Sequence, residues 1–142
     1  MSHKILVVDD DSAARRILTL LLQTTGEVLE ASTGDEALRL IESERPQLMV
    51  LDMVMPGMSG LEVLKAPQTS AAMMTIIVLT GQDDIELAKR ALELGAVEYI
   101  TKPFDLPRLK EKVERLVEAL SKDKKKDDGV PWRTVSDVPL ET

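Results

Sequence analysis

Hydrophobic residues in the first 120 positions of the chain fall into short runs that have the length of β-strands. Four such runs are KILVV (4–8), QLMVL (47–51), TIIVLT (75–80) and VEYIT (97–101). The first three are almost continuously Val, Ile, Leu or Met, which is typical of strands buried on both faces of a parallel sheet. A fifth run, EVLEA (27–31), alternates between polar and apolar residues and is therefore predicted to be an edge strand.

Between these runs, hydrophobic residues recur every three or four positions, which indicates amphipathic helices. Thr33 and Glu36 have capping-box spacing at the start of one helix, and Gly26 and Gly95 are predicted to end two others. Pro67 is expected to end a short helix. The predicted helices cover about 12–24, 34–44, 59–65, a segment that begins within 83–86, and 106–120.

Strand and helix thus alternate five times, which predicts a doubly wound α/β domain with right-handed crossovers. Five strands of this kind most often form a parallel sheet in the order 2-1-3-4-5. Ligands of such sheets bind at the carboxyl ends of the strands where the order reverses, between the first and third strands. Asp52 ends the third predicted strand, so we expect it at the rim of that crevice.

Composition and charge narrow the class of protein. The chain has 142 residues, 44% of them hydrophobic, which suits one soluble domain with a core, and only three residues are aromatic. It contains no cysteine, which excludes disulfides, thiolate metal sites and a cysteine nucleophile and fits a cytoplasmic location. No membrane span or signal peptide is predicted. The formal net charge of −7 argues against direct binding of nucleic acid.

The charge pattern changes near position 121. Residues 1–120 hold 13 Lys and Arg and 20 Asp and Glu, whereas residues 121–142 hold five of each. We therefore predict one domain over 1–120, followed by a charged linker and flexible tail over 121–142. That tail, which contains Trp132, is expected to be a flexible end, a short docking peptide, or the start of a linker to an output domain beyond it.

Residues with matching chemistry lie at the predicted ends of four strands. These residues are Asp9-Asp10-Asp11, Asp52, Thr80-Gly81 and Thr101-Lys102-Pro103. Crowded carboxylates repel one another, and a hard divalent cation with oxygen ligands, such as Mg²⁺, relieves that repulsion. Mg²⁺ and Lys102 together balance three carboxylates and leave donors for one phosphoryl group. Asp52 is then the predicted nucleophile, forming an acyl phosphate.

Four stretches of the chain carry a family resemblance: ILVVDDD, LMVLDMVMPGMSGLEVL, IIVLTG and EYITKPF. In this order and spacing they resemble a bacterial two-component response-regulator receiver domain, over about residues 3–120. The resemblance implies a flavodoxin-like, CheY-like fold. It also implies that Asp52 is the phosphoacceptor, and that Asp9, Asp10, Asp52 and the backbone carbonyl of Val54 hold Mg²⁺.

The same resemblance assigns further roles. Lys102 corresponds to the lysine that contacts the phosphoryl group, and Thr80 to the switch hydroxyl that moves toward it. Tyr99 matches the aromatic residue that swings inward with the hydroxyl, and Pro103 a proline that follows a cis bond. Val54 and Gln82 lie at positions that influence the lifetime of the phosphoryl group. The chain departs from the family in having Thr75 before IIVLT and an early Pro67.

As a receiver, the chain is expected to accept its phosphoryl group from a sensor histidine kinase or a phosphotransfer protein. It is not expected to be an enzyme beyond self-phosphorylation from a donor and slow autodephosphorylation. The face formed by the helix that Gly95 closes, the strand 97–101 and the helix 106–120 is expected to bind a downstream protein target or, after phosphorylation, a second copy. The helix 12–24 is the expected kinase-facing surface.

Other interpretations of the same residues remain open. Asp52 is also compatible with a simple turn acid, Asp11 with a helix N-cap, and Tyr99 with a partly exposed strand aromatic. A Mg²⁺-dependent phosphohydrolase or phosphotransferase of related fold is expected to carry a second carboxylate two residues after its nucleophile, where this chain has Val54. A flavin-binding domain is expected to have a Ser/Thr/Gly-rich loop after the first strand, where this chain has three aspartates.

Overall fold

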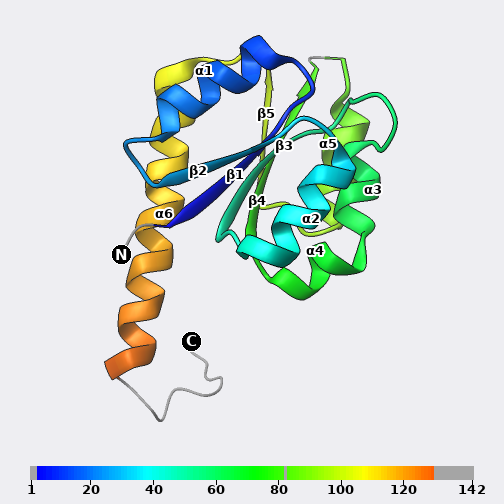
Figure 1. Cartoon of the computed structure of the whole chain (residues 1–142). Coiled ribbons are helices and arrows are strands. Elements are labelled where there is room, and N and C mark those ends of the chain that lie inside the picture. Colours follow the sequence, from blue (N-terminus) through cyan, green and yellow to red (C-terminus); the bar gives the residue numbers. More distant parts are fainter. Residues whose placement is uncertain (1–2, 82, 130–142) are drawn as a thin grey trace.

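The computed structural model describes residues 3–81 and 83–129, with the backbone alone from residue 121. Five parallel strands form one sheet in the order β2-β1-β3-β4-β5, which confirms the predicted fold (Figure 1). The strand bounds are β1 Lys4–Val8, β2 Glu27–Ala31, β3 Leu48–Asp52, β4 Thr75–Gly81 and β5 Glu98–Lys102. β2 lies at one edge of the sheet, as its alternating pattern predicted.

Helices cover both faces of the sheet (Figure 1). Their bounds are α1 Ser12–Leu22, α2 Gly34–Glu44, α3 Gly60–Lys65, α4 Pro67–Ala72, α5 Ile85–Glu93 and α6 Leu106–Gly129. One buried cluster includes residues from α1 and α6, and the other includes residues from α2, α3 and α5. The sheet is therefore the middle of three layers.

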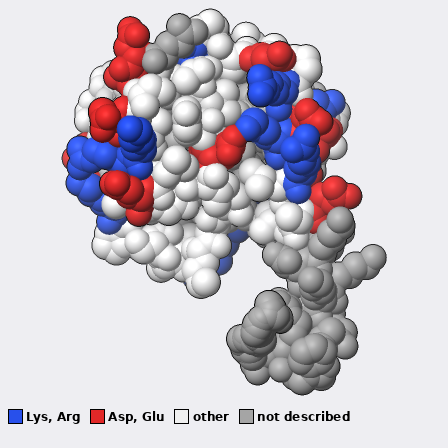
Figure 2. Space-filling model, turned by 180° about the vertical axis from the view of Figure 1, so that it is seen from behind, with Lys and Arg blue, Asp and Glu red and all other residues white. Residues whose placement is uncertain are grey.

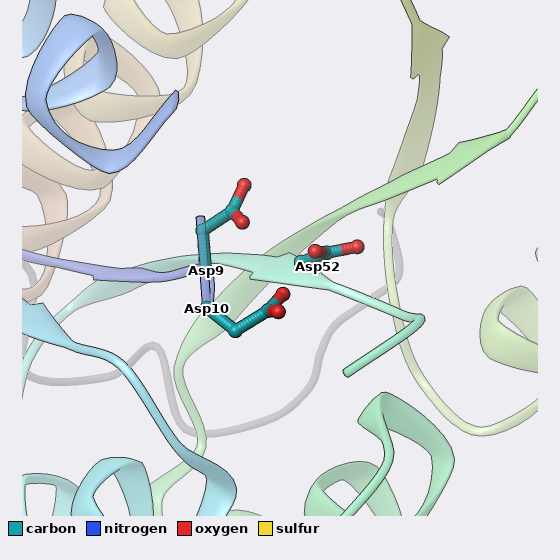
Figure 3. A group of neighbouring side chains, drawn as sticks. All are labelled: Asp9, Asp10 and Asp52. Carbon is teal, nitrogen blue, oxygen red and sulfur yellow. The ribbon is translucent and has the colours of Figure 1, made fainter. Parts of the chain in front are cut away.

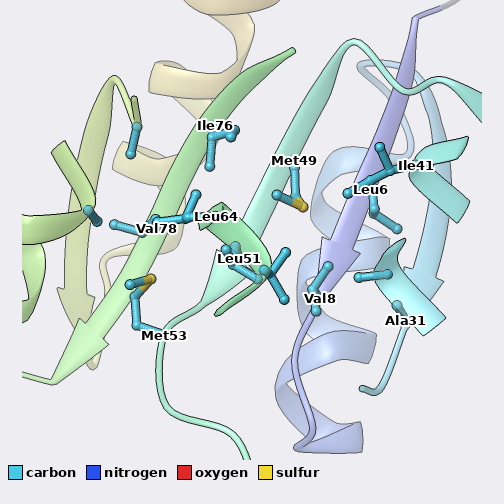
Figure 4. Close-up of a cluster of buried hydrophobic side chains, with 14 of the residues drawn as sticks. Leu6, Val8, Ala31, Ile41, Met49, Leu51, Met53, Leu64, Ile76 and Val78 are labelled. Atoms are coloured by element: carbon cyan, nitrogen blue, oxygen red, sulfur yellow. The ribbon is translucent and has the colours of Figure 1, made fainter. Parts of the chain in front are cut away.

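The central strands supply side chains to both hydrophobic layers. On β1, Leu6 and Val8 belong to the α2–α5 side, which Figure 4 shows, whereas Ile5 and Val7 belong to the α1–α6 side. Successive side chains of a strand point to opposite faces, so a strand with helices on both faces needs apolar residues at every position. This requirement explains why the sequences of β1, β3 and β4 read as continuous apolar runs.

Methionine is prominent in the layer on the α2–α5 side. Met49, Met53 and Met55 are buried there, and Met58 and Met74 pack against the same cluster. Three of these residues lie in the loop that follows β3 or at the start of that loop. The hydrophobic layer next to the β3–α3 loop is therefore filled by flexible thioether side chains rather than aromatic rings.

The helices α2 and α3 each begin with a side-chain cap. The Thr33 side chain accepts a hydrogen bond from the Glu36 N–H, as predicted for the start of α2, but the Glu36 carboxylate accepts from the Ser32 N–H and not from Thr33. A complete capping box occurs instead at α3. There the side chain of Ser59 and that of Glu62 each accept from the other's backbone N–H. The start of α3, directly after the β3 loop, is thus the more firmly fixed of the two.

The helix α3 ends at Lys65, as predicted for the short helix before Pro67, but the sequence did not predict the second helix that starts at Pro67. Pro67 is the first residue of α4, where its fixed φ angle suits a helix and its missing N–H costs nothing. The hydroxyl of buried Thr69 donates to the Val63 carbonyl at 2.6 Å and so joins α4 to α3. Met73, which adopts a left-handed conformation with φ 54°, ends α4.

α6 continues to Gly129, past the point near 120 where its apolar spacing stops. The helical backbone therefore includes the start of the segment predicted as a charged linker. The predicted tail from residue 130, with Trp132, lies outside the described residues. Within the part of the chain that is described, no helix combines the length and the hydrophobicity needed to cross a membrane.

Gly60→Ala should destabilise the protein by about 1–3 kcal/mol, because its new methyl group overpacks the core. A Cβ at this position would lie 2.6 Å from the Met53 Cα and 3.0 Å from the Asp52 carbonyl oxygen, both of which are backbone atoms. Urea unfolding followed by circular dichroism measures the loss. Gly81→Ala is the control, since its Cβ would meet only the Asp84 carboxylate at 3.3 Å. Equal stability of the two variants would contradict this account of the packing.

Candidate functional site

The polar residues predicted at the strand ends gather along the edge of the sheet that the carboxyl ends of its strands form. Asp9 directly follows β1, Asp52 is the last residue of β3, and Lys102 is the last residue of β5. Thr80 is in β4, where it lies opposite Thr101 of β5. Because all strands run parallel, their carboxyl ends meet at this edge, and the site combines residues up to 93 positions apart in the sequence.

Three carboxylates form the centre of the site (Figure 3). Asp9, Asp10 and Asp52 each offer an oxygen, and these oxygens all lie within 4.8 Å of one another. Asp9 is fully buried and Asp52 is 5% exposed, whereas Asp10 is exposed to solvent. The cluster therefore has two fixed, desolvated acids and one acid at its mouth.

Each buried carboxylate is held by a backbone N–H group and by Lys102. The Asp9 carboxylate accepts from the Asp11 N–H at 3.0 Å and from the Lys102 Nζ at 3.0 Å. The Asp52 carboxylate accepts from the Val54 N–H at 3.2 Å and from the Lys102 Nζ at 3.3 Å. Lys102 thus reaches from β5 across β4 to the acids of β3 and β1.

The surroundings of Asp52 favour its protonated form. Its pKa is raised from 3.8 to about 6, chiefly because burial disfavours the charged form. The Val54 N–H opposes this rise, the charge of Asp9 adds to it, and Lys102 opposes it. The pKa of Lys102 is also raised: burial, the largest single effect, lowers it, but the bonds and charges of Asp9 and Asp52 together outweigh burial.

The donor set fits a divalent cation. Three carboxylates and one ammonium carry a formal charge of −2 when all are ionised, so a divalent cation brings the site to neutrality. Carboxylate oxygens are the ligands that hard cations such as Mg²⁺ prefer, and the exposed side of the cluster leaves room for the waters that Mg²⁺ retains. Val54, whose backbone carbonyl was a further predicted ligand, lies two residues after Asp52 in the loop after β3 and has an exposed side chain.

Thr80 carries a buried hydroxyl group at the site. It is 1% exposed, and its Oγ1 has no hydrogen-bond partner among the described residues. At this position the hydroxyl is available to donate a hydrogen bond to a ligand of the site. The sequence predicted Thr80 at the site but contained no sign that its hydroxyl would be unpartnered.

Tyr99, the predicted switch aromatic, lies in β5 opposite Val78 and is 38% exposed. It lines an open pocket of about 400 Å³ together with Phe104, Arg108 and Lys112. The Lys102–Pro103 peptide bond is cis, as the family resemblance implied. Gln82, the other residue associated with phosphoryl lifetime, lies outside the described residues.

Asp11 and Arg15 add contacts to the site. Asp11 is the N-cap of α1, as the alternative interpretation of this residue held, and its side chain accepts from the N–H groups of Ala13 and Ala14. Its own N–H also binds Asp9. Arg15 donates from Nη1 to the Asp9 carbonyl at 2.7 Å. No motif marks Arg15, because this contact depends on how α1 packs over the end of β1.

Comparison with known proteins identifies the family. The model of the response regulator receiver domain matches residues 5–114, and the chain belongs to this family. The acidic cluster is typical of the Mg²⁺-binding site of receiver domains and is consistent with an aspartyl-phosphate site. A receiver domain is typically not a true enzyme, and it implies a histidine kinase or phosphotransferase as partner.

Similar proteins include stand-alone and longer members of the family. Sporulation initiation phosphotransferase F of Bacillus subtilis (strain 168) is 34% identical over 116 residues, covering 81% of this chain and 94% of that protein. The alkaline phosphatase synthesis transcriptional regulatory protein PhoP of the same strain is 37% identical over 146 residues. That match covers 99% of this chain, which spans only 61% of the length of PhoP.

Solved structures of receiver domains have the same fold. The CheY-like response regulator receiver domain protein of Methanospirillum hungatei JF-1 has a TM-score of 0.79 at 32% identity, over 87% of this chain and 99% of that one. Chemotaxis protein CheY4 of Vibrio cholerae has a TM-score of 0.74 at 30% identity, over 81% of this chain and 98% of that one.

Replacing Asp52 with asparagine should stabilise the metal-free protein increasingly as the pH rises from about 4 to about 7, and the gain should level off above that range. Because the pKa of Asp52 is higher in the folded state, its contribution to stability is greatest below pH 3.8 and is lost as the pH rises through about 6. Asparagine does not ionise and keeps an oxygen for the Val54 N–H. Urea unfolding in EDTA should show a gain of about 1–2 kcal/mol at pH 8. A gain that does not change with pH would contradict the assignment.

Proposed function

We propose that this receiver accepts a phosphoryl group on Asp52 in a Mg²⁺-dependent reaction and thereby changes which proteins it binds. The donor is a sensor histidine kinase or a phosphotransfer protein. One observation carries the proposal: Asp52 is buried at the end of a central strand, within 4.8 Å of two further acids and 3.3 Å from Lys102. A carboxylate with only a structural role has no need of that environment.

The residues divide the chemistry among them. A carboxylate oxygen of Asp52 forms a bond to phosphorus while the bond between phosphorus and the donor atom breaks, and its electron pair leaves with the donor. Lys102, held by Asp9 and Asp52, contacts the incoming phosphoryl oxygens. Asp9, Asp10, Asp52 and the Val54 carbonyl hold Mg²⁺, which when bound offsets the charge of those oxygens.

Phosphorylation then acts on Thr80 and Tyr99. The unpartnered Thr80 hydroxyl gains an acceptor when a phosphoryl oxygen comes within reach, which favours an inward position of Thr80. Tyr99, 38% exposed beside an open pocket, has room to follow. The change in free energy between the two arrangements sets how strongly a partner distinguishes them.

The partner surface is the face formed by α5, β5 and α6, seen from behind in Figure 2. Charged side chains of both signs gather there on either side of a mostly uncharged area. Exposed hydrophobic residues on α5 and its connection to β5 are Ile85, Leu92, Leu94 and Val97. Apolar surface between charged groups suits a protein partner, which is a downstream target or a phosphorylation-dependent second copy.

A second candidate is favoured by the alignment with PhoP, which its name describes as a transcriptional regulatory protein. In that case the receiver controls an output region within a longer protein instead of a separate partner. The phosphoryl chemistry at Asp52 is the same in both cases.

Incubation with Mg²⁺ and acetyl phosphate should add one phosphoryl group per chain, stable to acid and labile to base. Intact-protein mass spectrometry measures it. Asp52→Asn, which removes the nucleophile, and EDTA, which removes the cation, should each abolish the label. Asp10→Asn should weaken it, because it removes a charged oxygen ligand of the cation. A label that persists in Asp52→Asn would overturn the assignment. Rapid consumption of acetyl phosphate without a label would indicate a phosphohydrolase.

Replacing Tyr99 with alanine should leave phosphate incorporation almost unchanged but remove the response of the α5–β5–α6 face. Amide hydrogen exchange with and without acetyl phosphate reports on that face. Thr80→Val, which keeps the side-chain shape and removes the hydroxyl, should remove the same response. If Tyr99→Ala lost labelling and response equally, or lost neither, the relay through these two residues would be wrong.

A further inference from the structure

The Arg15 side chain joins three elements beside the acidic cluster. It lies near the start of α1, its Nη1 donates to the backbone carbonyl of Asp9 at 2.7 Å, and its Nε donates to the Glu30 carboxylate of β2 at 3.1 Å. The side chain is only 19% exposed. Arg15 therefore fixes the first peptide after β1, where the chain turns toward α1.

The Asp9 carbonyl is part of the peptide unit that links Asp9 to Asp10. The carbonyl group, the Asp10 nitrogen and the Asp10 Cα lie in one plane, so holding the oxygen sets the direction in which Asp10 leaves the strand. The Asp9 side chain has two bonds of its own, from Asp11 and Lys102. The Asp10 side chain makes no hydrogen bond or ion pair with any residue that the structure describes, so its place in the cluster depends on its backbone.

We propose that Arg15 is a positioning residue, which orients the Asp9–Asp10 peptide and thereby sets the affinity of the acidic cluster for Mg²⁺. The inference rests on the proposed function, since it requires that the cluster bind the cation. The Arg15 guanidinium is bonded both to the Glu30 carboxylate and to the Asp9 backbone oxygen. The held peptide keeps the exposed carboxylate of Asp10 close to those of Asp9 and Asp52.

Lysine does not replace arginine in this role. The two bonds of Arg15 leave from different nitrogens of one rigid guanidinium, whereas lysine has a single nitrogen on a flexible stem. Arg15→Lys therefore keeps the charge but loses one of the two anchors. Glu30→Gln keeps Arg15 and weakens the anchor on β2.

Charge and position act in opposite directions at this site. A positive charge near a bound cation repels it, so loss of the Arg15 charge alone would tighten Mg²⁺ binding. Loss of the held peptide would weaken it. Arg16, the neighbouring exposed residue on α1, provides a matched control because Arg16→Gln removes the same charge without disturbing the Asp9 carbonyl.

Isothermal titration calorimetry with MgCl₂ on the whole chain tests the proposal. Arg15→Gln and Arg15→Lys should each weaken Mg²⁺ binding by about tenfold, the lower end of the range for residues that orient metal ligands. Glu30→Gln should weaken it less, and Arg16→Gln should leave it unchanged or slightly tighter. Circular dichroism establishes that each variant is folded.

Two negative results have different meanings. If the unaltered protein takes up no Mg²⁺, the proposed metal-dependent function fails. If it binds Mg²⁺ and Arg15→Gln binds equally well or more tightly, as Arg16→Gln does, the positioning role is wrong and Arg15 only stabilises the fold. Should Arg15→Gln not fold, unchanged affinity in Arg15→Lys and Glu30→Gln would overturn the proposal just as well.

Discussion

Repulsion among three carboxylates at one sheet edge is the constraint on which the rest of this receiver depends. Asp9, Asp10 and Asp52 offer oxygens within 4.8 Å of one another, and Lys102 is the cation that bonds to two of them. Burial disfavours the charged form of Asp52 and the charge of Asp9 adds to this effect, so the pKa of Asp52 rises to about 6. Because the fold holds these acids together, the cluster favours added positive charge. A bound divalent cation supplies that charge and lets the site accept an anionic group as well.

The sheet makes this crowding possible. In the order β2-β1-β3-β4-β5, the ends of β1 and β3 are neighbours, although Asp9 and Asp52 are 43 positions apart in the sequence. Lys102 must come from the far edge strand, and its long side chain spans the distance that the backbone cannot. Dense aliphatic packing on both faces holds the strands in register, and this register brings the ends of β1 and β3 together.

Much of this arrangement follows from sequence because it is encoded by local periodicity. Continuous apolar runs predicted the buried parallel strands, and the polar residue ending each run predicted the side chains that share the site. Features set by tertiary contacts were not predictable in this way. The end of α3 before Pro67 was predicted, but the second helix that begins at Pro67 was not, because it is supported by the hydrogen bond between Thr69 and the Val63 carbonyl. Arg15 carries no motif, and the missing partner of Thr80 emerges only when its neighbours are known.

The methionine side chains packed next to the β3–α3 loop influence how this domain accommodates movement. Met53, Met55 and Met58 are unbranched and change rotamer at low cost, so the layer adapts its shape without leaving a void. Displacement of the loop is thus absorbed locally rather than passed through a rigid aromatic core. Oxidation of a thioether sulfur in this layer would also disturb its packing, because a sulfoxide oxygen there is a polar group in an apolar environment.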